Sequence, residues 1–231
     1  KNNQPCVVNL SMGSSNGPHD GTELFSQYMD KLAERAVVCV AAGNEGADGI
    51  AITKTLTEAD KNVNTFLMPL AAQGQTGTIE VWSNTNQEFK VTPVLYDLTT
   101  KALVYKLPTI SSSTNGTLQY VSTTNAADEG DVTSSFFDAA YDRSYVGYGS
   151  AVDAYNNRYT VAMQYYLLLN TVSNPKGNVA FGLMVEGNPG QRIDVYCNSN
   201  YTTLASNDIP GWTAGGGDGS ITDVQRFSNI F

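Results

Sequence analysis

The first fifty residues contain two short apolar runs separated by one amphipathic segment. Residues 6–13 and 36–42 are rich in valine and end in small residues, which is typical of buried parallel strands. Over residues 23–36 the apolar side chains recur at helical spacing, on Leu24, Phe25, Tyr28, Met29, Leu32 and Ala33. Strand, helix and strand with short connections predict a βαβ unit whose two strands belong to one parallel sheet.

From about residue 62 the hydrophobic period changes to two, and clusters of Asn, Gly, Pro and Ser separate the apolar runs. This pattern predicts eight to ten short strands, which is typical of a β-sandwich or jelly roll. Three runs place their apolar residues on one face, namely Tyr159, Val161, Met163, Tyr165 and Leu167; Val179, Phe181, Leu183 and Val185; and Ile193, Val195 and Cys197.

Together the two patterns predict a mixed fold class, with a partial α/β parallel sheet and a larger antiparallel β-sandwich. We expect the α/β segment at residues 1–58, a jelly-roll-like β-sandwich at residues 62–203 and a further segment at residues 204–231. A βαβ unit of about fifty residues buries too little apolar surface to offset its ordering entropy. It therefore needs the sandwich or a second copy of the chain, and oligomerisation is one way to supply a partner.

Charge excludes several partners. The chain has 22 acidic and 13 basic residues, a net charge of −9, and no cluster of Lys or Arg. Repulsion across most of the surface disfavours nucleic acid and anionic membranes. No apolar run approaches the roughly 20 residues that span a bilayer, so membrane insertion is not expected.

The sequence predicts no cofactor. One histidine is too few for a typical zinc site, and the three cysteines form no C-x-x-C motif. Cys6, Cys39 and Cys197 all fall in predicted strands, where we expect them to be buried as small apolar residues. Calcium is the one alternative, because acidic residues gather at Asp128, Glu129, Asp131, Asp138 and Asp142. Solvated loop charge is the simpler account of that cluster.

The most specific motif is Ala41-Ala42-Gly43-Asn44-Glu45-Gly46, directly after the second apolar run. Ligand-binding groups collect at the carboxyl ends of parallel strands, so the Asn44 amide is a candidate hydrogen-bond donor to a reacting group. The alternative is a plain turn in which Gly and Asn supply positive φ. A second motif, Asn9-Leu10-Ser11-Met12-Gly13, ends the first apolar run.

In this order, the two motifs and the intervening helix resemble a subtilisin-like serine protease (subtilase, peptidase family S8), in the part between its catalytic His and Ser. The resemblance implies that Asn44 is the oxyanion-hole donor. It implies that Ala41, Ala42 and Gly43 wall a substrate pocket with Glu45 at its rim, and that the substrate backbone pairs with Ser11, Met12, Gly13 and Ser14. It further implies that the β-sandwich at residues 62–203 is an insert in the protease domain and that residues 204–231 are the return segment. A polypeptide substrate and a secreted, periplasmic or cell-surface location are implied as well.

The chain departs from the family in lacking a catalytic triad. It contains neither Gly-Thr-Ser nor His-Gly-Thr-His. The single histidine, His19, lies in a loop before the helix, where Asp20 and Glu23 have the spacing of a capping box. We therefore expect the central part of a serine endopeptidase, inactive by itself.

Two other functions stay open at this stage. One is a pseudoprotease, in which the whole protein lacks part of the triad. The other is a non-catalytic β-sandwich module that binds a glycan or a protein. Trp82, Tyr145 and Tyr148 could stack on a sugar ring in such a module, although aromatic residues of β-domains are more often core or cross-strand pairs.

Overall fold

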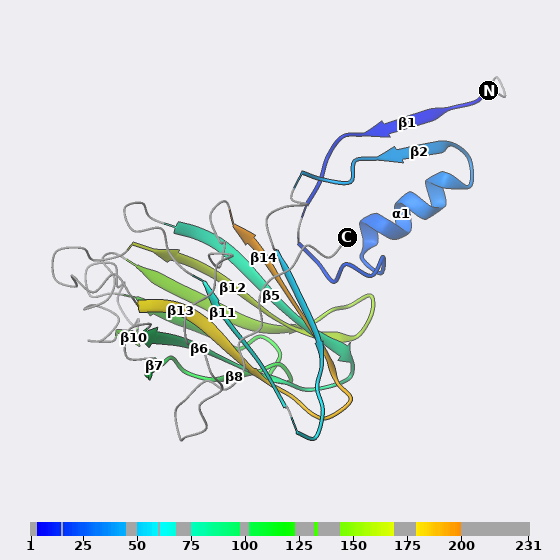
Figure 1. Ribbon diagram of the computed structural model, residues 1–231. Coiled ribbons are helices and arrows are strands. Elements are labelled where there is room, and N and C mark those ends of the chain that lie inside the picture. The colour runs from blue at the N-terminus through cyan, green and yellow to red at the C-terminus, as the bar shows by residue number, and fades with distance from the viewer. Residues whose placement is uncertain are drawn as a thin grey trace.

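The computed structural model describes residues 4–14, 16–44, 50–59, 61–67, 75–97, 102–122, 132–133, 144–168 and 179–199. Glu45, the five clustered acidic residues and the expected return segment 204–231 lie outside these residues; the acidic residues are Asp128, Glu129, Asp131, Asp138 and Asp142. The described chain has one helix, α1 (Leu24–Ala33), and fourteen strands (Figure 1). The strands are β1 (Val7–Leu10), β2 (Val37–Val40), β3 (Ala51–Thr55), β4 (Asn62–Leu67), β5 (Gln75–Thr85), β6 (Lys90–Asp97), β7 (Ala102–Lys106), β8 (Ile110–Ser111), β9 (Leu118–Ser122), β10 (Val132–Thr133), β11 (Tyr145–Val152), β12 (Arg158–Leu167), β13 (Val179–Glu186) and β14 (Arg192–Ser199).

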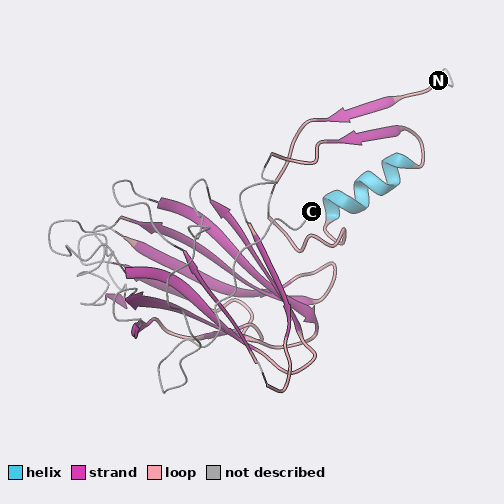
Figure 2. Cartoon of the chain, viewed as in Figure 1, coloured by secondary structure: helices cyan, strands magenta, loops and turns pink. Residues whose placement is uncertain are grey.

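Most of the strands form two open sheets. One has the order β10-β9-β11-β12-β5-β14-β3, and the other has the order β4-β13-β6-β7 with β8 also paired to β6. Every pairing in these sheets is antiparallel except β10 with β9. The strands lie in two layers, which Figure 2 shows in magenta.

The two sheets share one hydrophobic core. Tyr165 of β12 and Phe181 of β13 meet across it with ring centroids 6.0 Å apart. The period-two pattern is confirmed, because Val161, Met163, Tyr165 and Leu167 are all buried while Ala162 and Gln164 between them are exposed. Phe181, Leu183 and Val185 of β13 are also buried, as are Ile193, Val195 and Cys197 of β14.

The first and last strands of the sandwich are neighbours. β3 pairs antiparallel with β14, with Ala51 opposite Tyr196. Just before β3, the Ile50 carbonyl accepts a hydrogen bond from the Cys197 backbone N–H at 2.8 Å. The chain therefore begins and ends the sandwich at the same edge of the larger sheet.

The N-terminal arm, which consists of β1, α1 and β2, projects from the sandwich (Figure 1). β1 and β2 pair in parallel, but this sheet has only two strands and neither contains a buried residue. The prediction of a mixed fold with a subtilisin-like parallel α/β sheet is therefore wrong. The described protein is mostly β and almost entirely antiparallel, with a single helix.

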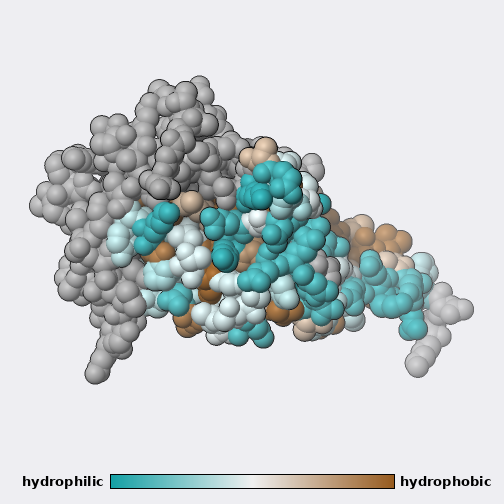
Figure 3. Space-filling model, turned by 90° about the horizontal axis from the view of Figure 1, so that it is seen from below, coloured by the Kyte–Doolittle hydropathy of each residue, from teal (hydrophilic) through white to brown (hydrophobic). Residues whose placement is uncertain are grey.

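Apolar side chains on the arm are exposed, because no other element of the described residues covers them. None of the α1 residues is buried, although its apolar stripe forms as predicted. Val7, Tyr28 and Val37 are each more than 60% exposed, and Figure 3 shows apolar surface on the arm at the right of the picture. The burial predicted for Cys6 and Cys39 is wrong for the same reason, whereas Cys197 is buried as predicted.

The predicted capping box is also wrong. Glu23 is the N-cap of α1 and makes no side-chain capping bond. Asp20 instead accepts a hydrogen bond from the Thr22 backbone N–H at 3.0 Å, which forms a local turn before the helix. Helical segments in the described residues are too short or too polar to cross a membrane.

Candidate functional site

The two motifs singled out in the sequence lie side by side because their strands are parallel. In the register of the pair, Leu10 of β1 is opposite Val40 of β2. The pairing continues one residue further, since the Ala41 backbone N–H donates to the Leu10 carbonyl at 3.1 Å. Residues 11–14 and 41–44 therefore leave the same edge of the arm together, as expected for the carboxyl ends of adjacent parallel strands.

These residues line one cavity of about 430 Å³ between the arm and the sandwich. Its walls combine the eight residues 11–14 and 41–44 with one residue each from the loop at residues 16–22 and from β14. The lining residues are Ser11, Met12, Gly13, Ser14, His19, Ala41, Ala42, Gly43, Asn44 and Asn198. We call this cavity the cleft. Of the predicted site residues, only Glu45 lies outside the described chain.

Residues 11–14 form an exposed wall that belongs to no strand. The Asn9 side chain donates to the Ser11 hydroxyl at 3.0 Å, and the Ser14 hydroxyl accepts from the Asn16 backbone N–H at 3.2 Å. Above Gly13 there is open space, because an added Cβ would meet no atom within 4 Å. A peptide backbone can therefore approach this segment closely.

Asn44 ends the opposite wall, and its side chain is exposed. Gly43 before it has a φ of 90°, a conformation that glycine adopts without steric cost. The turn carries the chain out of β2 and leaves the Asn44 amide on the surface of the cleft. An amide in this position can donate hydrogen bonds to a bound carbonyl or oxyanion.

Two residues of the cleft were not among the predicted site residues. His19, predicted as an exposed loop residue, stacks on Tyr196 of β14 with ring centroids 4.0 Å apart. Asn198, two residues further along β14, points outward because Cys197 beside it points into the core. Its side chain donates to the Asn16 side-chain carbonyl at 3.3 Å, which links the sandwich to the loop.

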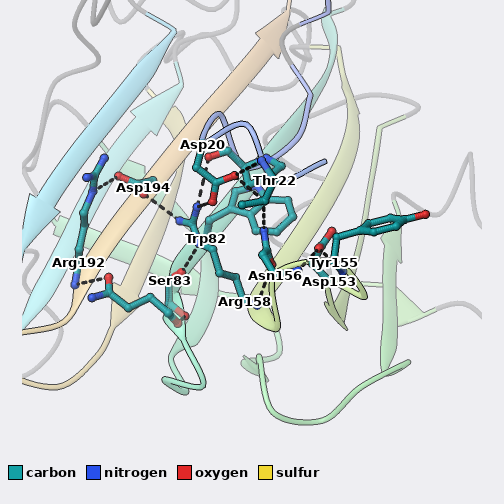
Figure 4. A network of polar contacts seen from close by, with 12 residues as sticks. Asp20, Thr22, Trp82, Ser83, Asp153, Tyr155, Asn156, Arg158, Arg192 and Asp194 are labelled. Atoms are coloured by element: carbon teal, nitrogen blue, oxygen red, sulfur yellow. Dashed lines mark hydrogen bonds and ion pairs between the residues drawn. The ribbon is translucent and has the colours of Figure 1, made fainter. Parts of the chain in front are cut away.

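The loop at residues 16–22 is held on the outer face of the larger sheet by Arg158 of β12 (Figure 4). The Arg158 guanidinium donates to the Asp20 carboxylate at 2.8 Å and to the Pro18 carbonyl at 3.3 Å. It also donates to the Asp194 carboxylate at 3.0 Å and lies 5.6 Å from the centre of the Trp82 ring. A second link is the hydrogen bond from the Asn156 side chain to the Thr22 hydroxyl at 2.7 Å.

Charge in this network is well compensated. Asp194 is buried, and it accepts hydrogen bonds from Arg158, Arg192 and Thr53. Partial burial by itself raises the pKa of Asp20. Hydrogen bonds from Thr22 and Arg158, together with the Arg158 charge, outweigh burial and hold that pKa below its ordinary value. The Asp194 carboxylate also raises the pKa of Arg192.

The described residues contain no group of three His, Cys, Asp or Glu side chains arranged to hold a metal. The site therefore offers an amide donor, an exposed peptide segment and small-residue walls. An exposed backbone segment of this kind can pair with an extended peptide.

Comparison with known proteins finds similarity among solved structures. No protein-family model matches the chain, and no curated protein sequence matches it significantly. The structure of the Clostridium perfringens CspB protease matches with a TM-score of 0.59 at 15% identity. The match covers 90% of this chain but only 38% of the protease chain. At this identity the likeness describes the fold, and the chain spans well under half the length of that protein.

Proposed function

We propose that this chain is the central part of a subtilisin-like serine endopeptidase. It supplies Asn44 as the oxyanion-hole donor and residues 11–14 as the segment that pairs with the substrate. The observation that carries this proposal is the cleft, which brings both motifs of the family resemblance onto one surface. Likeness in fold to a protease chain is consistent with it.

Exposed apolar surface on the arm also supports the proposal. A helix with an apolar stripe normally packs on a sheet, yet Leu24, Phe25 and Tyr28 of α1 are all more than half exposed. Val7 and Val40 on the two strands are similarly exposed. Other parts of a complete protease would cover these faces.

The catalytic contribution of the chain is electrostatic. Attack on a peptide carbonyl places negative charge on its oxygen, and a fixed donor stabilises that charge only as it develops. Asn44, in the turn that follows β2, lines the same cleft as residues 11–14, and its amide would supply this donor. A peptide aligned on that backbone would present successive carbonyl groups to the amide.

The proposal is tested with the complete open reading frame that contains this chain. A triad should be encoded on either side of it, and Asn44→Ala should lower kcat by about 10²–10³, the loss found when such a donor is removed from a subtilisin. KM should change little, because the bond forms with the transition state rather than the bound substrate. Asn115→Ala, in an exposed turn of the sandwich, is the matched control and should leave both constants unchanged.

Two results would contradict the proposal. Unchanged kcat in Asn44→Ala would remove Asn44 from the oxyanion hole. A reading frame without the triad would favour a pseudoprotease. The chain by itself should neither cleave fluorogenic peptides nor react with a serine-directed phosphonate, and labelling above a heat-treated sample would refute the expected inactivity.

A further inference from the structure

A second cavity, of about 370 Å³, lies on the outer face of the larger sheet beside the loop at residues 16–22. We call it the groove. It is built on neighbouring strands β5, β12, β11 and β9, and its lining includes Asn16, Glu80, Tyr120, Tyr145, Gly147 and Gln164. Neither the sequence motifs nor the proposed catalytic role uses it.

The groove adjoins the cleft. Asn16 lines the groove, and its side-chain carbonyl accepts the hydrogen bond from Asn198, which lines the cleft. One hydrogen-bonded pair of exposed amides therefore separates the two cavities. An extended polypeptide in the cleft can continue across this pair onto the sheet.

Glu80 is a fixed carboxylate in this groove. Its Oε2 accepts hydrogen bonds from the Gly17 backbone N–H at 2.8 Å and from the Trp82 indole N–H at 3.0 Å. The structure shows no hydrogen-bond partner for Oε1 in the described part of the chain. Glu80 is also the only charged residue among those that line the groove, and the net charge of the chain is −9. The groove is therefore anionic and has an acceptor available for a ligand.

Aromatic rings form the far wall of the groove. Tyr120 and Tyr145 stack with ring centroids 5.7 Å apart and an angle of 19° between their planes. Tyr120 also packs against Gly147, where an added Cβ would lie 3.2 Å from its ring. Tyr145 in turn stacks on Tyr166 at 6.2 Å. Tyr145 is packed on both of its sides and so holds Tyr120 in place, and a tyrosine ring attracts cationic side chains.

We propose that the groove binds a Lys or Arg side chain of the polypeptide held in the cleft, with Glu80 as its counter-charge and Tyr120 and Tyr145 as its aromatic wall. This specificity site rests on the proposed function, because the cleft supplies the rest of the peptide. It lies on the sandwich, away from Asn44, and so adds selectivity without touching the reacting bond.

Binding to the whole chain tests this directly and needs no catalysis. The probes are fluorescein-labelled extended peptides with one arginine placed at successive positions, each matched by a peptide with neutral citrulline at that position. Anisotropy should show that arginine at one position binds about tenfold more tightly than citrulline, as expected for one partly desolvated charge with a carboxylate and an aromatic face. The preference should shrink as salt rises, because the charges are then screened.

Variants separate the groove from the general negative charge of the protein. Glu80→Gln keeps an acceptor for Gly17 and Trp82 but should abolish the arginine preference. Glu186→Gln removes an exposed carboxylate from β13 of the other sheet and should preserve it. Tyr145→Ala should weaken the preference without any change of charge, and it carries the test if Glu80→Gln unfolds.

Three outcomes would overturn this inference. They are equal binding of arginine and citrulline peptides at every position, an arginine preference that both glutamate variants reduce equally, and no peptide binding at all. If the groove does not bind arginine, the expected effect of Asn44→Ala on kcat in the complete protease is unchanged. Conversely, an arginine preference without any effect of Asn44→Ala on kcat would retain the groove and reject the oxyanion role.

Discussion

Arg158→Ala should detach the N-terminal arm from the sandwich. This one side chain bridges the Asp20 carboxylate and Pro18 carbonyl of the loop to the Asp194 carboxylate and Ser83 carbonyl of the sheet. Its side chain is 12% exposed, so these contacts lie largely out of water. Truncation removes all of them and leaves the buried Asp194 carboxylate with fewer partners.

The expected loss in the free energy of unfolding depends on which hydrogen-bond donors Asp194 retains. Removal of one partner from a fully buried ion pair costs about 3–5 kcal/mol. Here Arg192 and Thr53 still donate to Asp194, and Arg192 also retains the opposite charge, so we expect a loss of about 2–3 kcal/mol. For a chain of this size, each kcal/mol lowers Tm by about 2–4 °C, which gives a decrease of about 5–10 °C.

Arg192→Ala is the matched control. Arg192 contacts the same carboxylate at 2.8 Å, but its side chain is 54% exposed and no bond connects it to the loop. Arg192→Ala should therefore lower the free energy of unfolding by about 1 kcal/mol or less. Circular dichroism gives Tm, and hydrogen exchange with mass spectrometry reports on the arm. Residues 16–40 should exchange faster in Arg158→Ala only. Equal losses of Tm in both variants, or unchanged exchange in the arm, would refute the reasoning.

Three further predictions concern pH and packing. The pKa of Asp20 in the folded protein lies below its ordinary value of 3.8. The ionised Asp20 carboxylate therefore stabilises the fold fully above pH 3.8, and this contribution is lost as pH falls through the lower folded pKa. Asp20→Asn should remove this loss of stability from an acid-unfolding curve. Burial and the Asp194 charge raise the pKa of Tyr196 to about 12. The free energy of unfolding should therefore fall as pH rises from about 10 through 12, and it should fall less in Tyr196→Phe. Phenolate absorbance follows the ionisation of Tyr196 over the same range. Gly187→Ala places a Cβ 2.4 Å from Oε1 of buried Gln191 and should cost about 1–3 kcal/mol in urea unfolding, whereas Gly13→Ala, which faces open space, should cost much less.

Alternation along the strands was predictable because it is a local property of an extended chain. The run from Val161 to Leu167 has the same inward face in the structure as in the sequence pattern. Convergence of residues 11–14 with Asn44 was predictable for a similar reason, since parallel neighbours end at one edge. What failed was the fold class. A valine-rich run shows which face would be buried beside a partner, but it does not show whether the chain contains that partner, and β1 and β2 lack one in the described residues.

Docking of the loop on the sheet had no comparable local signal. Asp20 and Arg158 are 138 positions apart, and single charged residues are common on protein surfaces. The stacking of His19 on Tyr196 and the place of Asn198 in the cleft depend on the same docking. Asp194 gave the best indication of this docking, because it is a carboxylate between the two inward-facing residues Ile193 and Val195. Its side chain must point to the outer face of the sheet, and a charge there needs a partner if another segment covers it.

The pairing of β3 with β14 has a consequence for how such a chain can be assembled. Paired strands lie about 4.8 Å apart, so the sandwich begins and ends within the width of a hairpin. The entropy lost on closing a loop depends on the separation of its ends, and a folded sandwich holds them together whatever its length. To the flanking polypeptide it is thus equivalent to a tight turn. A short turn, or another domain whose ends also meet, would therefore hold the two points of attachment equally close, although it would remove the surface on which the loop at residues 16–22 docks.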